Sequence, residues 1–447
     1  MSAVVEAGDG YRAAFERLAP GFPGRGQGWL EDLRRESLGR FRRLGLPTEK
    51  DEEWRFTSVG PIAKTDFAPA PRPARYDDVD LKELSLSLFD AYRMVFVNGY
   101  FVPELSTELP PDGTGAPVGG AGCELASLAR LLNDKPQKVK AHFASRNGST
   151  KAFAALNTAL FQDGAVIVLG PGAQLDKPVH LLFVSTMHEA PTMAHARVLV
   201  VAEKGARATI VEEYAGGGPI PTFTNVVTEV SAGEGSHLDY YRLQREGCVA
   251  FHVSSLQVRQ GRDSVFQAHS ISLGGALVRN DASVSLEAEG ADCALNGLYL
   301  LGGRQHLDNH TVIDHATPHG TSRELYKGVL DGHARAVFDG SIVVRRAAQK
   351  TDARVYNKNL LLSEHGLVNT KPEFKINAND VQCKHGATIG QIPAEALFYL
   401  RSRGIGAEAA RSLLIFAFAS EMVDRVAIGP LREALSSALH AWLPETA

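Results

Sequence analysis

Short β-rich runs separated by Gly, Asp or Asn dominate the pattern of apolar and polar positions from about residue 164 to residue 390. No stretch between them has the length and apolar spacing of a crossover helix, so a sheet of β-α-β units is not indicated. The pattern instead predicts a mainly β core. The runs that we expect to be strands are Ala165–Leu169, Val179–Val184, Arg197–Val201, Ala208–Glu212, Leu238–Leu243, Phe251–Val258, Ala282–Leu286, Leu298–Leu301 and Ala336–Val344.

Turn-like signals precede several of these runs at intervals of roughly 25–30 residues, a spacing that is typical of stacked structural repeats. They are Gly205-Ala206, Gly235-Ser236, Arg262-Asp263, Gly290-Ala291 and Gly332-His333. An elongated β-helix explains such a series best. A β-sandwich is the alternative, but so many consecutive strands exceed the usual size of its sheets.

Helical patterns stand near both ends of the chain. Apolar residues in Trp29–Leu44 follow a helix-like spacing. Gly45 and Pro47 then mark the end of this predicted helix. Near the other end, Pro393–Arg403 and Ala407–Ile428 predict two helices separated by two glycines. The second helix would have a broad apolar face. That face contains Leu413, Leu414, Ala417, Phe418, Met422 and Val426.

Two local signals complete the organisation of the chain. Asn-Gly at 98–99 predicts a β-hairpin, because both residues accept the positive φ of a two-residue hairpin turn. The Gly/Pro-rich stretch Pro110–Gly122 predicts a loop. We therefore expect a mostly helical N-terminal domain with a hairpin at 1–163, a β-helix core at 164–390 and a C-terminal helical domain at 391–447.

The composition narrows the class of protein. Of the 447 residues 44% are apolar, and the net charge of −4 comes without a basic block, so we expect no nucleic-acid partner. No run of 18 apolar residues predicts a membrane span, and Met1–Gly10 lacks the pattern of a secretory signal. The four cysteines are scattered without a CxxC pair, which is typical of a reducing compartment, and we expect the cytoplasm.

Cys383 and His385 form the most suggestive short motif. Side chains two residues apart on a strand point to the same face, so the thiol and the imidazole would emerge side by side. This donor pair suits an iron–sulfur species or zinc, although two ligands cannot close a site. The competing interpretation is a buried thiol beside a hydrogen-bonded histidine. We expect Cys248 and Cys293, which lie in β-rich repeats, to be core residues.

Four histidines between residues 304 and 320 give a second candidate site. In an extended chain His306, Asp308 and His310 share one face, whereas His315 and His319 share the other, so a single strand cannot gather all four. A zinc site is one interpretation. Polar ladders between successive solenoid turns are the more economical one.

Motifs of several enzyme classes are absent. The sequence contains no GxxxxGK[ST], no GxGxxG that opens a strand-turn-helix unit, and no GxSxG or HExxH pattern. Asp314, Asp331 and Asp339 could serve a β-helix polysaccharide lyase or hydrolase. The chain lacks the rows of aromatic residues that a sugar cleft needs, so this enzyme is the weaker alternative to a protein without catalysis of its own.

Longer segments resemble the SufB/SufD family of iron–sulfur cluster assembly proteins. The run Pro47–Thr57 (PTEKDEEWRFT) is similar to the PTxKxEEWRYT segment of the SufD branch. This segment and the chain length favour the SufD branch over the SufB branch. Core signatures of the family are matched by Ser322–Leu330, Phe338–Gly340, Asn359–Ser363, Asn369–Glu373, Cys383–Gly390 and Glu395–Gly404. One departure is Glu364–Val368, where members have a small or acidic segment. We expect His365 to be a loop residue, and a role as an additional ligand stays open.

The resemblance implies a right-handed parallel β-helix core flanked by N-terminal and C-terminal helical domains. It also implies a non-catalytic scaffold subunit in a complex of one SufB, two SufC ATPases and one SufD, with the C-terminal helices binding SufC. In the family the Cys-x-His pair lies at the SufB–SufD interface, so His385 would be the main ligand of a transient iron–sulfur cluster or iron, and Cys383 an accessory one. We expect no tightly bound cofactor in the isolated chain and a role in iron acquisition, and the choice between a homodimer and a monomer in the absence of partners stays open.

Overall fold

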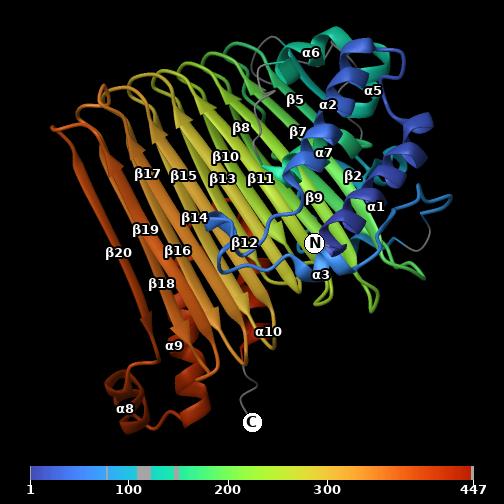
Figure 1. The fold of residues 1–447 in the computed structure, drawn as a ribbon. Coiled ribbons are helices and arrows are strands. Elements are labelled where there is room, and N and C mark those ends of the chain that lie inside the picture. Colours follow the sequence, from blue (N-terminus) through green and yellow to red (C-terminus); the bar gives the residue numbers. More distant parts are fainter. Residues whose placement is uncertain (1, 77–78, 108–121, 145–150, 444–447) are drawn as a thin grey trace.

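The computed structural model describes residues 2–76, 79–107, 122–144 and 151–443. Within these residues two ten-stranded sheets form the walls of a parallel β-solenoid of about 8 turns (Figure 1). Helices lie at both ends of the chain. The predicted mainly β fold, with a parallel β-helix core and helical flanks, is therefore confirmed. The loop expected at Pro110–Gly122 lies outside the described residues, except for its last residue.

Consecutive strands alternate between the two sheets, so each solenoid turn contributes one strand to each wall. In spatial order, sheet A contains β4 (Cys123–Ser127), β5 (Asp163–Leu169), β7 (Thr192–Ala202), β9 (Thr222–Ala232), β11 (Phe251–Gln260), β13 (Leu277–Leu286), β15 (His306–His315), β17 (Arg335–Val344) and β19 (Leu367–Ile376), with β1 (Ala68–Pro69) beside β7. Sheet B contains β3 (Tyr100–Phe101), β2 (Tyr92–Val97), β6 (Val179–Ser185), β8 (Arg207–Gly216), β10 (His237–Gln244), β12 (Val265–Ser272), β14 (Asp292–Leu301), β16 (Thr321–Leu330), β18 (Asp352–Leu361) and β20 (Gln382–Gly390). From β5 and β6 onward the pairing is parallel and in register.

From β7 onward, short turns join each strand of sheet A to the following strand of sheet B. Gly205, Gly235 and Asp263 occupy these turns with φ of 70°, 63° and 52°, a region that Gly enters freely and Asp tolerates. The turns stack, because the Gly205 N–H donates to the carbonyl of Glu234 and the Gly235 N–H to that of Arg262, each at 2.8 Å. The predicted turns are confirmed, except that the fifth lies at the opposite edge of the solenoid, between β16 and β17.

Every second side chain of both sheets fills the interior of the solenoid. On β14, Cys293, Leu295 and Tyr299 point inward and are at most 1% exposed. Gly297 leaves room for the ring of Tyr326 on the next strand, since a Cβ on Gly297 would lie 2.1 Å from that ring. Burying one Leu or Val side chain stabilises the fold by roughly 1.5–3 kcal/mol, and each further turn repeats this gain.

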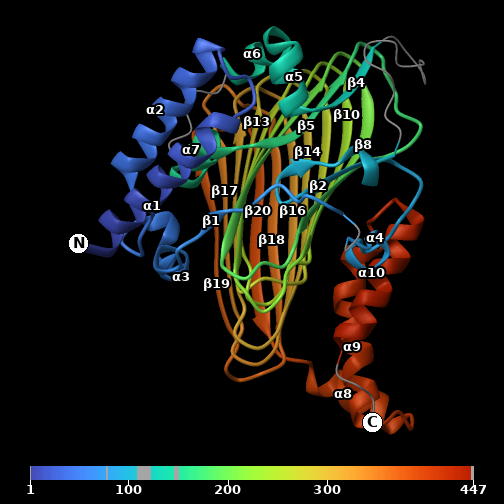
Figure 2. The same ribbon diagram turned by 90° about the vertical axis from the view of Figure 1, so that its right-hand side faces the viewer.

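Helices from the N-terminal part cover the outer face of sheet A (Figure 2). They are α1 (Ser2–Leu18), α2 (Gly28–Leu44), α3 (Gly60–Lys64), α5 (Leu128–Asp134), α6 (Pro136–Ala144) and α7 (Ala152–Leu160). The short helix α4 (Leu81–Leu84) packs on side chains of sheet B instead. The helix expected at Trp29–Leu44 is confirmed by α2. The predicted hairpin is confirmed by β2 and β3, which are joined by Asn98 and Gly99 with φ of 55° and 85°.

Helices α8 (Ala394–Ser402), α9 (Ala407–Val423) and α10 (Gly429–Trp442) follow β20, and the last two pack on the outer face of sheet B (Figure 2). The single helix predicted for Ala407–Ile428 is wrong at its C-terminal end. A new helix begins at Gly429, where Pro430 fits the first turn because it needs no N–H donor there. No helix in the described part of the chain is long and apolar enough to cross a membrane.

Leu413 of the predicted apolar face of α9 is 50% exposed, whereas Met422 of that face packs toward sheet B together with Ile415. One predicted core residue is wrong. Cys248 is exposed, because it lies in the corner between β10 and β11 and not on a strand. Cys293, in contrast, is buried as expected.

Glu324 of β16 is a carboxyl group inside this apolar core. Its neighbours in the strand register are Leu295 and Val355, and its exposed fraction is 2%. Burial raises the pKa of Glu324 from its ordinary 4.5 to about 8. At neutral pH the folded chain therefore keeps a proton on Glu324 that the unfolded chain has lost. The contribution of this proton to the free energy of unfolding is fully present below pH 4.5 and is lost as the pH rises through 8.

We predict that Glu324→Gln makes the protein less sensitive to alkaline pH. The amide has the shape of the protonated acid but cannot ionise, so the variant should keep on the order of 4 kcal/mol of unfolding free energy that the wild type loses between pH 4.5 and pH 9. Urea unfolding at pH 5, 7 and 9 measures the difference. Glu364→Gln, in an exposed turn, is the control. Parallel pH curves for Glu324→Gln and the wild type would contradict the prediction.

Candidate functional site

Cys383 and His385 lie on β20, the last strand of sheet B. This strand pairs with β18, and its other edge has no partner strand within the described residues. Cys383 stands beside Ala353 and His385 beside Val355, and both neighbours are 0% exposed in the core. The thiol and the imidazole therefore share the inner face of the terminal strand, at the open end of the solenoid.

The two side chains differ in exposure. Cys383 is half-buried and packs against the core, whereas His385 is exposed, with its ring centroid 5.3 Å from that of Phe374 on β19. Burial, together with the nearby Asp352 carboxylate, raises the pKa of the Cys383 thiol. The thiol is therefore protonated at neutral pH. The exposure of His385 excludes a buried core histidine, and an exposed imidazole can bind an incoming metal ion.

These two donors do not complete a metal site. In the part of the chain that the structure describes, no group of three or more His, Cys, Asp or Glu side chains is arranged to hold a metal ion. Cys293 lies in the same inward column as Cys383, with Ser322 and Ala353 between them. At normal strand spacing, three strand steps separate the two cysteines by about 14 Å, so Cys293 cannot bind the same metal ion. Further ligands of a four-coordinate site would have to come from another molecule that faces the open end.

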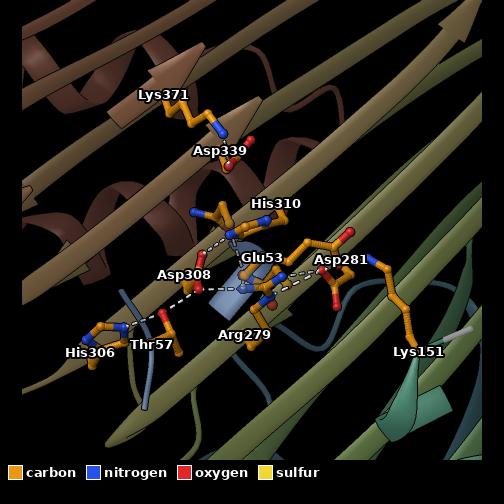
Figure 3. Close-up of polar contacts among 12 residues, drawn as sticks. Glu53, Thr57, Lys151, Arg279, Asp281, His306, Asp308, His310, Asp339 and Lys371 are labelled. Atoms are coloured by element: carbon orange, nitrogen blue, oxygen red, sulfur yellow. Dashed lines mark hydrogen bonds and ion pairs between the residues drawn. The ribbon is translucent and has the colours of Figure 1, made fainter. Parts of the chain in front are cut away.

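The histidines from His306 to His319 do not converge on one point. His306 and His310 project outward from β15 on the same face as Asp308, as the spacing predicted (Figure 3). His315 points into the core, where burial lowers its pKa to about 4. His319 lies in the turn before β16 with φ 60°. The polar contacts between turns fit the ladder interpretation.

The outward side chains of β13 and β15 form a buried charge network instead (Figure 3). The Arg279 guanidinium is 0% exposed and lies 2.9 Å from the Asp281 carboxylate and 2.6 Å from that of Asp308. The Nε2 atom of His310 lies 3.0 Å from Asp308. Burial alone would raise the pKa of Asp308, but Arg279 and His310 hold it below its ordinary value. The carboxylates therefore stay ionised and anchor the arginine.

The N-terminal segment 52–57 lies over this network. The Arg279 guanidinium stands 4.2 Å from the ring centroid of Trp54, and the hydroxyl oxygen of Thr57 lies 2.9 Å from Nε2 of His306. Sequence reasoning singled out both this segment and His306, but it gave no signal that would pair residues 249 positions apart. The network is a structural contact between the N-terminal part and sheet A.

The structure also places three other candidate residues. His365 lies in the exposed turn between β18 and β19, as expected, and its ring stacks on that of His333 with centroids 4.6 Å apart. Asp314 pairs with Arg345 at 2.5 Å, and Asp339 of β17 lies 3.8 Å from Lys371. These aspartates have cationic partners, an arrangement that does not favour acid–base catalysis.

Exposed apolar side chains lie on α8 and α9, and of these the sequence analysis named only Leu413 individually, as part of an apolar helix face. Phe398 and Tyr399 of α8 are 74% and 57% exposed, and Leu413 of α9 is 50% exposed. Helix α8 has no buried residue and packs against α9. Large apolar groups concentrated on a surface are typical of a contact with another protein.

The chain matches two family models along most of its length. Residues 23–181 match the N-terminal region of SufBD proteins, and residues 183–418 match the SufBD core domain of the SUF system of FeS cluster assembly. The chain is 35% identical to an iron–sulfur cluster assembly SufBD family protein of Synechocystis, over 87% of this chain and 86% of the relative. It is 30% identical to the iron–sulfur cluster assembly protein SufD of Escherichia coli over 92% of each chain, and 25% identical to SufD of Bacillus subtilis over 92% and 93%. The chain therefore belongs to the SufBD family of iron–sulfur cluster assembly proteins.

Proposed function

We propose that this protein works as the SufD-type scaffold of a Suf iron–sulfur cluster assembly complex in the cytoplasm. It pairs with SufB, holds SufC ATPase and supports iron acquisition, without catalysis of its own. The observation that carries this proposal is the position of Cys383 and His385 on the inner face of a terminal strand whose outer edge has no partner strand within the described residues. The sequence has no GxxxxGK[ST] phosphate-binding loop, which supports giving ATP hydrolysis to SufC in this proposal.

His385 is the main ligand in this proposal, and Cys383 is an accessory one. The imidazole is exposed and can bind without rearrangement, whereas the half-buried thiol must first lose a proton that burial makes harder to remove. Two donors hold iron or a nascent cluster only weakly until a partner adds its own ligands. A cluster built at such a shared site can leave when the partners separate.

SufB is the partner proposed for the open end of the solenoid. Both β19 and β20 have a free edge within the described residues, and a free edge pairs readily with another strand. The same edges would join two copies of this chain when SufB is absent. In both assemblies Cys383 and His385 would face the partner.

SufC is the partner proposed for the C-terminal helices. Phe398, Tyr399 and Leu413 offer an apolar surface there that the chain itself does not cover. Because α9 and α10 pack on sheet B, a force on these helices reaches the solenoid directly. When ATP draws two SufC subunits together, their motion would pass through these helices, shift the SufB–SufD pair and expose the interface ligands.

We predict that His385→Ala lowers cluster content in the complete complex. Removing the imidazole deletes the exposed donor while the strand keeps its backbone pairing with β18. Co-purification with SufB and SufC, followed by anaerobic iron and sulfide analysis, should give a stable complex with several-fold less iron and sulfide. Lys384→Ala is the matched control, because Lys384 is exposed on the opposite face of the same strand. Equal cluster content in all three proteins would remove the ligand role.

We also predict that replacing Phe398 and Tyr399 together by Asp weakens SufC binding at least about tenfold. Charged groups at the centre of an apolar contact are desolvated without a partner. Titration of SufC onto the purified chain by calorimetry measures the change, and circular dichroism checks the fold. Met187→Asp, a 71% exposed apolar residue between β6 and β7, should bind SufC normally. Unchanged affinity of the double variant would place the docking surface elsewhere.

A further inference from the structure

A cavity of about 390 Å³ lies between α1, the short 3-10 helix Ala19–Gly21 and α2, apart from every site described above. Its lining includes the apolar side chains of Phe15, Phe22 and Leu30. Cavities of this size with mostly apolar walls and a few polar groups are typical binding sites of small organic molecules.

Arg34 of α2 also lines this cavity and is only 2% exposed. Its Nη1 atom donates to the carbonyl oxygens of Ala159 at 3.2 Å and Phe161 at 3.0 Å, at the C-terminal end of α7. Its guanidinium lies 4.1 Å and 3.8 Å from the ring centroids of Phe22 and Phe161. These contacts stabilise the positive charge but use only one of the three guanidinium nitrogens.

The other two nitrogens of Arg34, Nε and Nη2, are buried and have no hydrogen-bond partner among the described residues. Their N–H groups point in the same direction along one edge of the guanidinium. That edge binds both oxygens of a carboxylate in two parallel hydrogen bonds. Buried donors without acceptors cost free energy, and an anion on this edge would recover it.

No acidic side chain in the described part of the chain balances the charge of Arg34. Burial, and then the like charge of Arg197, lower the pKa of Arg34 to about 9, so the group is still cationic at neutral pH. Arg197 itself pairs with Glu229 at 2.8 Å. The two acidic residues of the cavity have other partners. Glu16 accepts a hydrogen bond from the Arg12 side chain, and Glu31 accepts one from the backbone N–H of Gly26.

We propose that this cavity binds a small organic monocarboxylate, with its carboxylate on the Nε–Nη2 edge of Arg34 and its apolar body against Phe15, Phe22 and Leu30. One free guanidinium edge matches a single carboxylate, because the other two arginines of the lining, Arg25 and Arg35, already contact the Pro20 carbonyl and the Asp32 carboxylate. The two donors are covered in the present conformation, so the ligand reaches them when the ring of Phe22 turns aside. Phe22 lies in the extended segment between the 3-10 helix and α2, where such a movement breaks no helix.

Calorimetric titration of the full chain with octanoate tests this site, and octanamide is the neutral probe of the same shape. We expect saturable binding of octanoate and a rise in melting temperature on binding. Octanamide should bind at least about tenfold more weakly, because it lacks the charge that Arg34 pairs with. Absence of saturable octanoate binding, or equal binding of the two probes, would overturn the proposal.

Two variants and a control locate the site. Arg34→Gln should weaken octanoate binding at least about tenfold, whereas Arg42→Gln, an exposed arginine of α2 outside the cavity lining, should not change it. If Arg34→Gln fails to fold, Ala19→Phe decides, because it fills the cavity while Arg34 is kept. Octanoate binding that survives in Ala19→Phe, or that falls equally in Arg42→Gln, would show a different site. If the wild type does not bind octanoate and Arg34→Gln only lowers the melting temperature, the proposal is overturned. Arg34 would then serve only to cap the C-terminal end of α7.

Discussion

The parallel backbone ladder between successive solenoid turns is the interaction on which the rest of this structure depends. Each strand from β7 to β18 has a partner on both sides, so its N–H and C=O groups are satisfied and its side chains fall into fixed columns. The columns make the interior continuous, and a residue such as Glu324 takes its environment from Leu295 and Val355 on the neighbouring turns. The ladder also has to end, and among the described residues it ends at β19 and β20, each of which has one edge without a partner strand.

Charges hold the N-terminal part to this ladder. Arg279 is buried between Asp281 and Asp308 and below Trp54, so its charge is balanced within the fold. Nearer the open end, the Glu52 carboxylate lies 3.4 Å from Lys371 of β19. The same short N-terminal segment thus contacts several solenoid turns along the outer face of sheet A. A rigid stack of turns can transmit a displacement from one end of the molecule to the other.

The features proposed for function gather at one end of the stack. Cys383 and His385 stand on its last strand, and α8 with Phe398 and Tyr399 follows that strand directly (Figure 1). A partner on the helices and a partner on the open edge would therefore act on neighbouring parts of the chain. The cavity beside Arg34 lies among the N-terminal helices instead, which separates its proposed ligand from the cluster chemistry.

The sequence by itself determined the features that depend on local backbone geometry. Asn98 and Gly99 specify their hairpin turn, the recurring Gly and Asp positions specify the stacked turns, and the two-residue period puts His306 and His310 on one face. Only the tertiary structure decided which turn is the last, so that His385 is exposed while Glu324, two strands earlier in the same column, is buried. It also decided the exposure of Cys248 and Leu413, and the contact of Thr57 with His306. The reason is physical: φ and ψ preferences act over a few residues, whereas burial and pairing depend on which distant segments the completed fold brings together.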